Sequence, residues 1–248
     1  MSNETRPVKG RSGQTRRAAE PTKKSSSGLD LTTLMGIGVI VAVIGLAAYF
    51  VFGSGGNTPA ANAVQESADV TVEGEALPQF NAQNPGEDQA LGMAAPQVTG
   101  EDFAADEVTL LTEGEANILV FLAHWCPHCQ AETPLLVDEW SSGLPDNVNV
   151  TAVVTAQDAN QPNYPPSTWL DREDWTHPVI LDSEANDIAG AYGLTSYPFF
   201  VVTDAEGNVV ARTSGELGRE QIQNLVDVAE GAADASTVQT DEDSSDVE

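Results

Sequence analysis

The two cysteines of this chain lie two residues apart, in the sequence Trp-Cys-Pro-His-Cys over residues 125–129. Residues 118–123, which are separated from the motif by one residue, are apolar, and residues 130–136 after it are typical of a helix. A buried strand that delivers a Cys-x-x-Cys motif to the start of a helix is typical of sites that exchange disulfides. The motif therefore predicts redox chemistry at a strand–helix junction.

The positions of the two cysteines on the expected helix assign them different roles. Cys126 falls at the helix N-terminus, where unpaired backbone N–H groups and the helix dipole favour an anionic thiolate. Pro127 suits the first helical position, because its φ is fixed and its missing N–H is not needed there. Since the thiolate is the reactive form, we expect Cys126 to be the nucleophile and Cys129, one turn further on, to resolve the mixed disulfide.

Two other interpretations of the motif are open. The cysteines could form a disulfide without a catalytic role, although a loop of two residues adds little stability by restricting the unfolded chain. His124, Cys126, His128 and Cys129 are all residue types that bind metals, but one cysteine pair without a second such pair is weak for structural zinc. We therefore expect redox chemistry, with no resident metal and no cofactor.

Further motifs lie around and beyond the cysteines. Trp125 precedes the first cysteine, and Glu132 belongs to a Cys-x-x-Cys-x-x-Glu-x-Pro sequence. Residues 191–199 place Pro198 just before an apolar, strand-like stretch. With these motifs, residues 97–231 resemble a thioredoxin-fold domain of the membrane-anchored TlpA-like kind. The resemblance implies a thioredoxin-like α/β fold, and alternating strand and helix patterns indicate the same α/β class with a mixed central sheet flanked by helices.

The resemblance also implies roles for single residues. Pro198 would be the cis-proline beside the active site, and the backbone of its neighbour Tyr197 would pair with an incoming peptide. Glu132 would assist proton transfer near the second cysteine, and Trp125 would shape the surface that contacts the peptide. A turn proline, a solvated glutamate and a core tryptophan are the alternatives. Tyr197 is bulkier than the usual residue at its position, and we expect it to tune substrate choice.

The dipeptide between the cysteines bears on the direction of electron flow. Pro127-His128 resembles the dipeptide of DsbA-type oxidants, whereas TlpA-like reductants more often carry a second proline. His128 can stabilise the Cys126 thiolate, and a stabilised thiolate makes the Cys126–Cys129 disulfide oxidising. We therefore favour an oxidant, although the scaffold itself favours a reductant.

The N-terminal region predicts the compartment. Residues 31–52 are mostly apolar and carry no charged side chain, and about 20 such residues span a bilayer as one helix. Residues 1–30 hold seven Lys and Arg against three Asp and Glu, a net charge of 7 − 3 = +4. We expect residues 1–30 to stay in the cytoplasm and the catalytic domain to lie outside it. A cleaved signal peptide, with a site at residues 61–63, is the alternative.

The remaining segments are assigned by composition and periodicity. We expect residues 53–96 to form an acidic flexible linker and residues 232–248 a disordered acidic tail. The expected strands are residues 108–111, 118–123, 148–154, 179–181, 199–202 and 208–211. The expected helices are residues 127–140, 167–174, 184–192 and 219–230.

The part of the chain beyond the apolar segment is strongly acidic. Three arginines face 38 − 3 = 35 Asp and Glu there, a net charge of 3 − 35 = −32. This charge argues against nucleic acid or an anionic lipid surface as a partner, because both would repel it. A basic partner is one interpretation. Solubility, for example in a saline habitat, is the one we prefer, since the acidity is spread throughout.

Together these features predict a single-pass membrane protein with an extracytoplasmic thiol–disulfide oxidoreductase domain. We expect it to exchange disulfides with exported proteins and a membrane redox partner to reset Cys126 and Cys129. A TlpA-like reductant in cytochrome c maturation or disulfide repair is the first alternative. A copper-binding chaperone is the second alternative. The sequence lacks the Met and His tracts that often accompany copper handling, and Met93 is the only methionine beyond the apolar segment. A thiol peroxidase is a weaker possibility, because Ala123 stands where that family usually has Thr or Ser.

Overall fold

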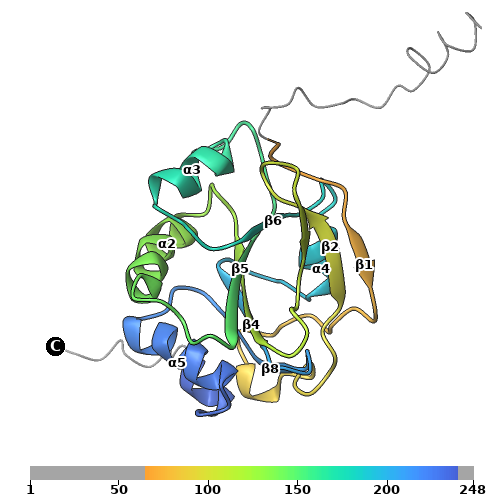
Figure 1. The fold of residues 1–248 in the computed structure, drawn as a ribbon, viewed down its shortest axis with the longest axis vertical. Helices are drawn as coiled ribbons and strands as arrows, with labels where there is room; N and C mark the ends of the chain where they lie inside the picture. The colour runs from red at the N-terminus through yellow and green to blue at the C-terminus, as the bar shows by residue number, and fades with distance from the viewer. Residues whose placement is uncertain (1–64, 240–248) are drawn as a thin grey trace, which may run out of the picture. The chain divides into compact units, whose positions relative to one another are not determined.

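The computed structural model describes residues 65–239 (Figure 1). Five strands in this range form a mixed sheet with the spatial order β6-β5-β4-β7-β8. Strands β4, β5 and β6 are parallel, while β7 is antiparallel to both β4 and β8. The strands are β4 Ala116–Leu122, β5 Val148–Val154, β6 Val179–Leu181, β7 Phe199–Thr203 and β8 Val209–Ser214.

The middle strand, β4, explains the apolar stretch before the cysteines. All seven of its residues are buried, because side chains of a strand alternate between two faces and both faces of this strand are covered. Ile118, Val120 and Leu122 belong to one hydrophobic core. Leu119 and Phe121 belong to the other. The strand therefore ends, just before residues 125–129, in a position fixed from both sides.

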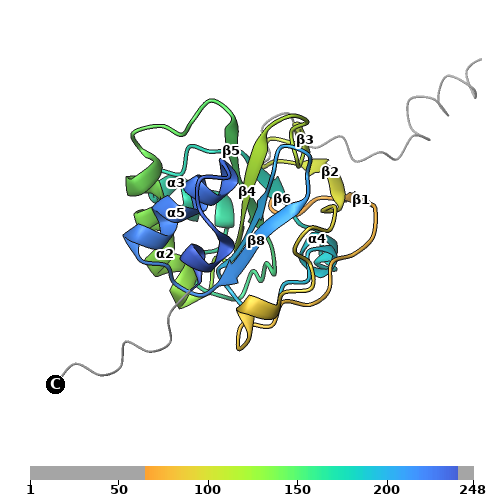
Figure 2. The same cartoon turned by 90° about the horizontal axis from the view of Figure 1, so that it is seen from below.

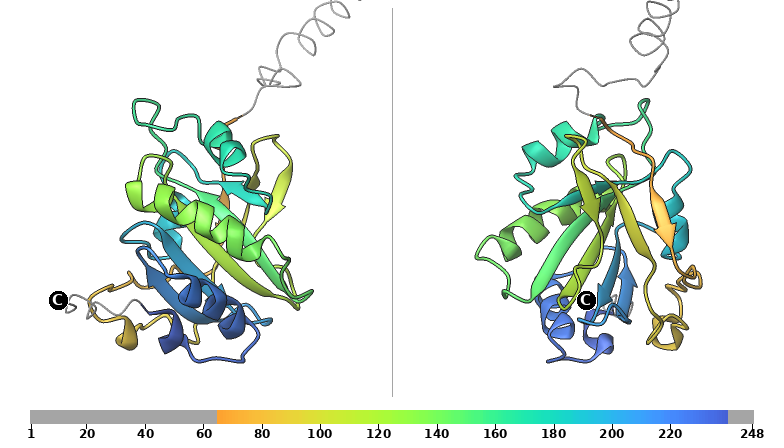
Figure 3. Two further views of the ribbon diagram at one scale, coloured as in Figure 1. Left: turned by 90° about the vertical axis from the view of Figure 1, so that its left-hand side faces the viewer. Right: turned by 45° about the vertical axis from the view of Figure 1, so that its right-hand side comes forward.

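Different elements cover the two faces of the sheet (Figure 2). Three helices supply residues to the first core, and the views in Figure 3 show two of them, α2 and α5, lying across the sheet. The second core lies against α4 and a three-stranded antiparallel sheet, β1-β2-β3. The helices are α2 Pro127–Trp140, α3 Pro166–Arg172, α4 Asp187–Ala191 and α5 Arg219–Ala229, with 3₁₀ turns η1 Pro85–Glu87 and η2 Ala235–Val238; the second sheet contains β1 Thr71–Glu73, β2 Gln97–Glu101 and β3 Glu107–Thr109.

The predicted thioredoxin-like α/β fold with a mixed sheet flanked by helices is confirmed. Each strand and helix predicted between residues 97 and 231 is present, and only the ends shift by a few residues. The prediction succeeds because local signals mark these elements, such as the apolar run of β4 and the Cys-Pro start of α2.

The prediction of a flexible linker over residues 53–96 is wrong for residues 65–96. Leu77, Phe80 and Ala90 are buried in the second core. The N–H of Phe80 donates to the carbonyl of Gly193, which has a φ of +70° and no room for a Cβ, since a Cβ there would lie 2.3 Å from a backbone oxygen. Apolar residues spaced along a polar segment are enough to dock it, although they leave no periodic pattern.

The C-terminal end of the described chain also differs from expectation. Residues 235–238, predicted as part of a disordered tail, form η2, and Val238 is fully buried in the first core. The predicted cytoplasmic tail of residues 1–30 and the predicted membrane span of residues 31–52 lie outside the described residues. Among residues 65–239, no helix combines the length and the apolar character needed to cross a bilayer.

Candidate active site

Cys126 is the N-cap of α2, four residues after Leu122, the last residue of β4. Pro127 occupies the first helical position, as the sequence predicts. The Cys126 side chain is within 3.9 Å of the Tyr197 carbonyl oxygen, and 6% of the residue is exposed. Cys129 is fully buried one turn further on. Both cysteines are free thiols in this structure, so the proposed Cys126–Cys129 disulfide would form from this reduced arrangement.

The environment of Cys129 disfavours its thiolate. Burial raises the pKa of the Cys129 thiol well above its usual range, and the neighbouring Cys126 and Glu132 raise it further, although a backbone hydrogen bond acts in the opposite direction. A thiol of this kind needs a base before it can attack a mixed disulfide.

Glu132 lies in the interior beside this thiol. The residue is fully buried, its Oε2 accepts the backbone N–H of Leu217 at 3.0 Å, and its Oε1 has no hydrogen-bond partner among the described residues. Burial raises the pKa of Glu132 to about 7, and the nearby Glu216 adds to this rise, while the hydrogen bond from Leu217 lowers it. A carboxylate that titrates near neutral pH, with one free oxygen, has the properties of a general base or acid.

Replacing Glu132 by Gln should slow the step in which Cys129 attacks the mixed disulfide by about 100-fold, the usual effect of a positioned proton acceptor. The wild-type rate of this step should rise with pH through about 7, as the carboxylate loses its proton. E132Q should lack that rise. Stopped-flow release of a peptide thiol between pH 5 and 9 measures both, with Glu139→Gln in the same helix as the control.

The same substitution should stabilise the folded protein at alkaline pH. Because its folded pKa is raised above the ordinary value, the Glu132 carboxyl favours folding at low pH, and this contribution is lost as pH rises through about 7. E132Q carries no charge and should unfold at higher urea concentration than the wild type at pH 8. Simultaneous loss of activity and stability would instead indicate a purely structural role.

The segment before β7 closes the other side of the site. The Tyr197–Pro198 peptide bond is cis, and Pro198 is buried. The ring of Tyr197 packs edge-on against Trp125, with centroids 5.9 Å apart. The indole N–H of Trp125 donates to the Ala156 carbonyl at 2.6 Å. The structure thus brings Cys126, Trp125 and the Tyr197–Pro198 pair together, as the sequence predicts.

His128 has a partner that the sequence did not indicate. Its Nδ1 lies 2.6 Å from a carboxylate oxygen of Glu216, and both side chains are largely exposed. A carboxylate next to the imidazole offsets the positive charge that a protonated His128 would bring to the Cys126 thiolate. Glu216 therefore reduces the positive charge through which His128 could stabilise the Cys126 thiolate and favour an oxidant.

The four residues considered as metal ligands do not converge. His124 directs both ring nitrogens at the loop between β5 and α3, with Nδ1 2.7 Å from the Pro162 carbonyl oxygen. Within residues 65–239, no group of three or more His, Cys, Asp and Glu side chains has an arrangement that could hold a metal ion.

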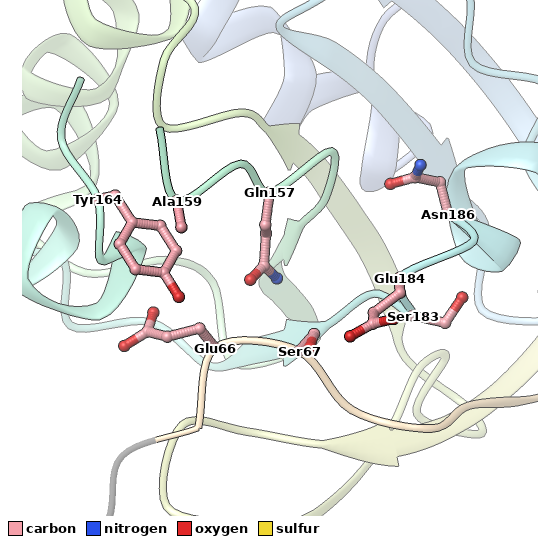
Figure 4. A pocket seen from close by; sticks show the side chains of 8 residues that line it. All are labelled: Glu66, Ser67, Gln157, Ala159, Tyr164, Ser183, Glu184 and Asn186. Carbon is pink, nitrogen blue, oxygen red and sulfur yellow. The ribbon is translucent and has the colours of Figure 1, made fainter. Parts of the chain in front are cut away.

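A cavity of about 510 Å³ lies beside the β5–α3 loop, residues 155–165 (Figure 4). Tyr164 and Gln157 of this loop face Glu66 and Ser67 across it. The sequence did not predict this cavity, because its walls come from segments about 100 residues apart. The sequence also did not predict that the His124 side chain contacts this loop. The position of His124 directly before Trp125 was the only available signal. The lining residues are Glu66, Ser67, Gln157, Ala159, Tyr164, Ser183, Glu184 and Asn186.

Comparisons with known proteins agree with this chemistry. Residues 74–212 match the AhpC/TSA family. The thiol-disulfide oxidoreductase ResA of Halalkalibacterium halodurans is 23% identical over 141 residues, which cover 57% of this chain and 75% of that protein. ResA of Bacillus anthracis is 25% identical over 56% of this chain and 79% of that protein. A thiol:disulfide interchange protein of Chlorobium tepidum has 22% identity and a TM-score of 0.48, with 57% of this chain and 98% of that chain covered. The chain therefore belongs to the AhpC/TSA family and is a thiol–disulfide oxidoreductase.

Proposed function

We propose that this protein is a membrane-anchored reductant that opens disulfides in exported proteins through Cys126 and Cys129. Residues 1–30 would lie in the cytoplasm, residues 31–52 would cross the membrane, and the segment up to residue 64 would connect the anchor to the catalytic domain. The basic N-terminal tail and the uncharged apolar stretch support this arrangement. Cytochrome c maturation and the repair of wrong disulfides are the processes that the TlpA-like resemblance implies.

In the proposed reaction, the Cys126 thiolate attacks one sulfur of the substrate disulfide and the other sulfur leaves as a thiolate. Glu132 then accepts the proton of Cys129, which attacks the sulfur of Cys126. The second substrate thiol leaves, and the Cys126–Cys129 disulfide forms. Two electrons have then passed from the cysteine pair to the substrate. A membrane redox partner must return two electrons and two protons to the site. Pro198 and the Tyr197 carbonyl would seat the substrate chain, with Trp125 beside them.

The observation that carries the reducing direction is the buried Glu132 carboxylate next to a Cys129 thiol whose pKa burial raises. In DsbA a stabilised reduced form makes the disulfide strongly oxidising. Surroundings that disfavour a thiolate withhold that stabilisation, so we expect the couple to have a lower potential. The Glu216 carboxylate beside His128 acts in the same sense. Relatives named thiol-disulfide oxidoreductase ResA fit this alternative better than the oxidant role that Pro127-His128 favours.

The equilibrium reduction potential of the Cys126–Cys129 pair tests the proposal. The purified full-length protein in detergent is equilibrated with glutathione or dithiothreitol buffers, and the free thiols are counted by alkylation and mass spectrometry. We expect a potential near about −270 mV, as in thioredoxin. A potential of about −120 mV, as in DsbA, would instead support the oxidant function.

A further inference from the structure

His124 is a fully buried histidine two residues before Cys126 that the proposed reaction does not use. Its Nδ1 is 2.7 Å from the Pro162 carbonyl oxygen, and its Nε2 is 3.2 Å from the backbone nitrogen of Asp158. The carbonyl oxygen can only accept and the backbone N–H can only donate. His124 is therefore a neutral imidazole with its proton on Nδ1, and it holds the β5–α3 loop at two points.

The backbone of His124 adds further contacts to the same region. Its carbonyl oxygen accepts the side-chain amides of Gln130, on α2, and of Asn163, in the loop. The ring of Tyr164 packs edge-on against the imidazole, with centroids 5.7 Å apart. One residue thus connects the end of β4, the first turn of α2 and most of the length of the loop.

The loop held in this way borders the site of chemistry on one side and the cavity on the other. Ala156 accepts the indole N–H of Trp125, which neighbours Cys126. Its next residue, Gln157, lines the cavity together with Ala159 and Tyr164 (Figure 4). The cavity, at about 510 Å³, is within the range of volumes that binding pockets have, and its lining is mainly hydroxyls, amides and carboxylates. It suits a polar segment of a peptide chain.

We propose that His124 is a positioning residue that fixes the β5–α3 loop as the wall of a subsite for the polar chain flanking the substrate disulfide. This inference rests on the proposed function, because it assigns part of the substrate-binding surface of the same site. His124 acts on the affinity for an extended substrate and leaves the sulfur chemistry of Cys126 and Cys129 unchanged. A small disulfide, which does not reach the subsite, is handled without it.

Single-turnover kinetics of the pre-reduced full-length protein test this assignment with two substrates. One is a polar 12-residue peptide with an internal disulfide, and the other is 2-hydroxyethyl disulfide. Replacing His124 by Phe keeps the ring and removes both hydrogen bonds, so the half-saturating peptide concentration should rise about tenfold. The limiting rate, the reduction potential and the rate with 2-hydroxyethyl disulfide should stay unchanged. Asn can still donate to Pro162, and H124N should recover part of the affinity.

His177→Phe is the matched control. His177 is half-buried against Trp140, the last residue of α2, and Cys126 lies at the opposite end of that 14-residue helix, about 20 Å away. H177F should leave the half-saturating concentration unchanged even if both variants melt at a lower temperature. Equal peptide affinity of H124F and wild type would overturn the inference, as would equal slowing with both substrates. A wild-type protein that reduces neither substrate would instead contradict the proposed function.

Discussion

Replacing Cys126 by Ser is expected to abolish disulfide exchange, with a loss of at least about 1,000-fold, as is common when an enzyme loses its nucleophile. Of the two cysteines only Cys126 is at the helix N-cap, and only Cys126 retains some exposure. An incoming disulfide can therefore reach Cys126 and not the fully buried Cys129. Turnover of a peptide disulfide by the purified full-length protein measures the loss.

Replacing Cys129 by Ser should give a different defect. The nucleophile remains, so the first attack proceeds, but no thiol is left to release the substrate from Cys126. The variant should accumulate a covalent protein–substrate adduct, visible as a mass increase that dithiothreitol removes. C126S should form no such adduct. An adduct in C126S and none in C129S would reverse the roles of the two cysteines.

The order of the strands and helices was predictable because the determining signals are local. The apolar residues 118–123 and the Cys-Pro start of α2 are contiguous in the sequence, and both elements form where expected. Gly193, with a positive φ after α4, likewise follows from the usual end of a helix. Docking of residues 65–96 was not predictable, since it depends on Leu77 and Phe80 reaching partners more than 100 residues away.

The candidate site divides in the same way. The cysteines and Trp125 share one motif, and Pro198 lies in a recognisable segment before β7, so sequence alone could place them near each other. The Glu216 partner of His128 is 88 residues away and could not be read from either local sequence. The sequence also could not show whether Glu132 is solvated or buried, because its helix has no strong amphipathic pattern around the cysteines. In the structure Glu132 is fully buried.

Replacing Arg212 by Met should destabilise the folded protein by about 3–5 kcal/mol, the usual effect of leaving a buried charge unpaired. Arg212 and its partner Asp88 are both almost completely buried. Its Nε donates to Asp88 at 2.8 Å, and its Nη1 donates to the carbonyl oxygens of Pro78 and Tyr192. The guanidinium also lies 5.5 Å from the ring centroid of Phe80. Urea denaturation followed by tryptophan fluorescence measures the loss.

Two further variants separate the effect of the Arg212–Asp88 charge pair from the effect of side-chain packing. Replacing Arg212 and Asp88 together by Leu removes both charges, and the double variant should regain most of the stability that R212M loses. Arg219 pairs with Asp138 and Glu139 at the surface, and R219A should change the midpoint little, because water screens exposed pairs. A double variant as unstable as R212M would show that packing of the long side chain, and not charge pairing, provides the stabilisation.

The loss of Arg212 should also reach the active site. Its hydrogen bond to the Tyr192 carbonyl fixes the end of α4, and the chain runs from there through Gly193 to Tyr197 and Pro198. R212M should therefore reduce peptide turnover below the level that its folded fraction accounts for, while alkylation of Cys126 by iodoacetamide stays at the wild-type rate. Turnover that simply follows the folded fraction would limit Arg212 to holding residues 77–90 on the domain. Arg212, on β8, thus bonds on one side to Pro78 and Asp88 and on the other to Tyr192, whose segment continues to Pro198.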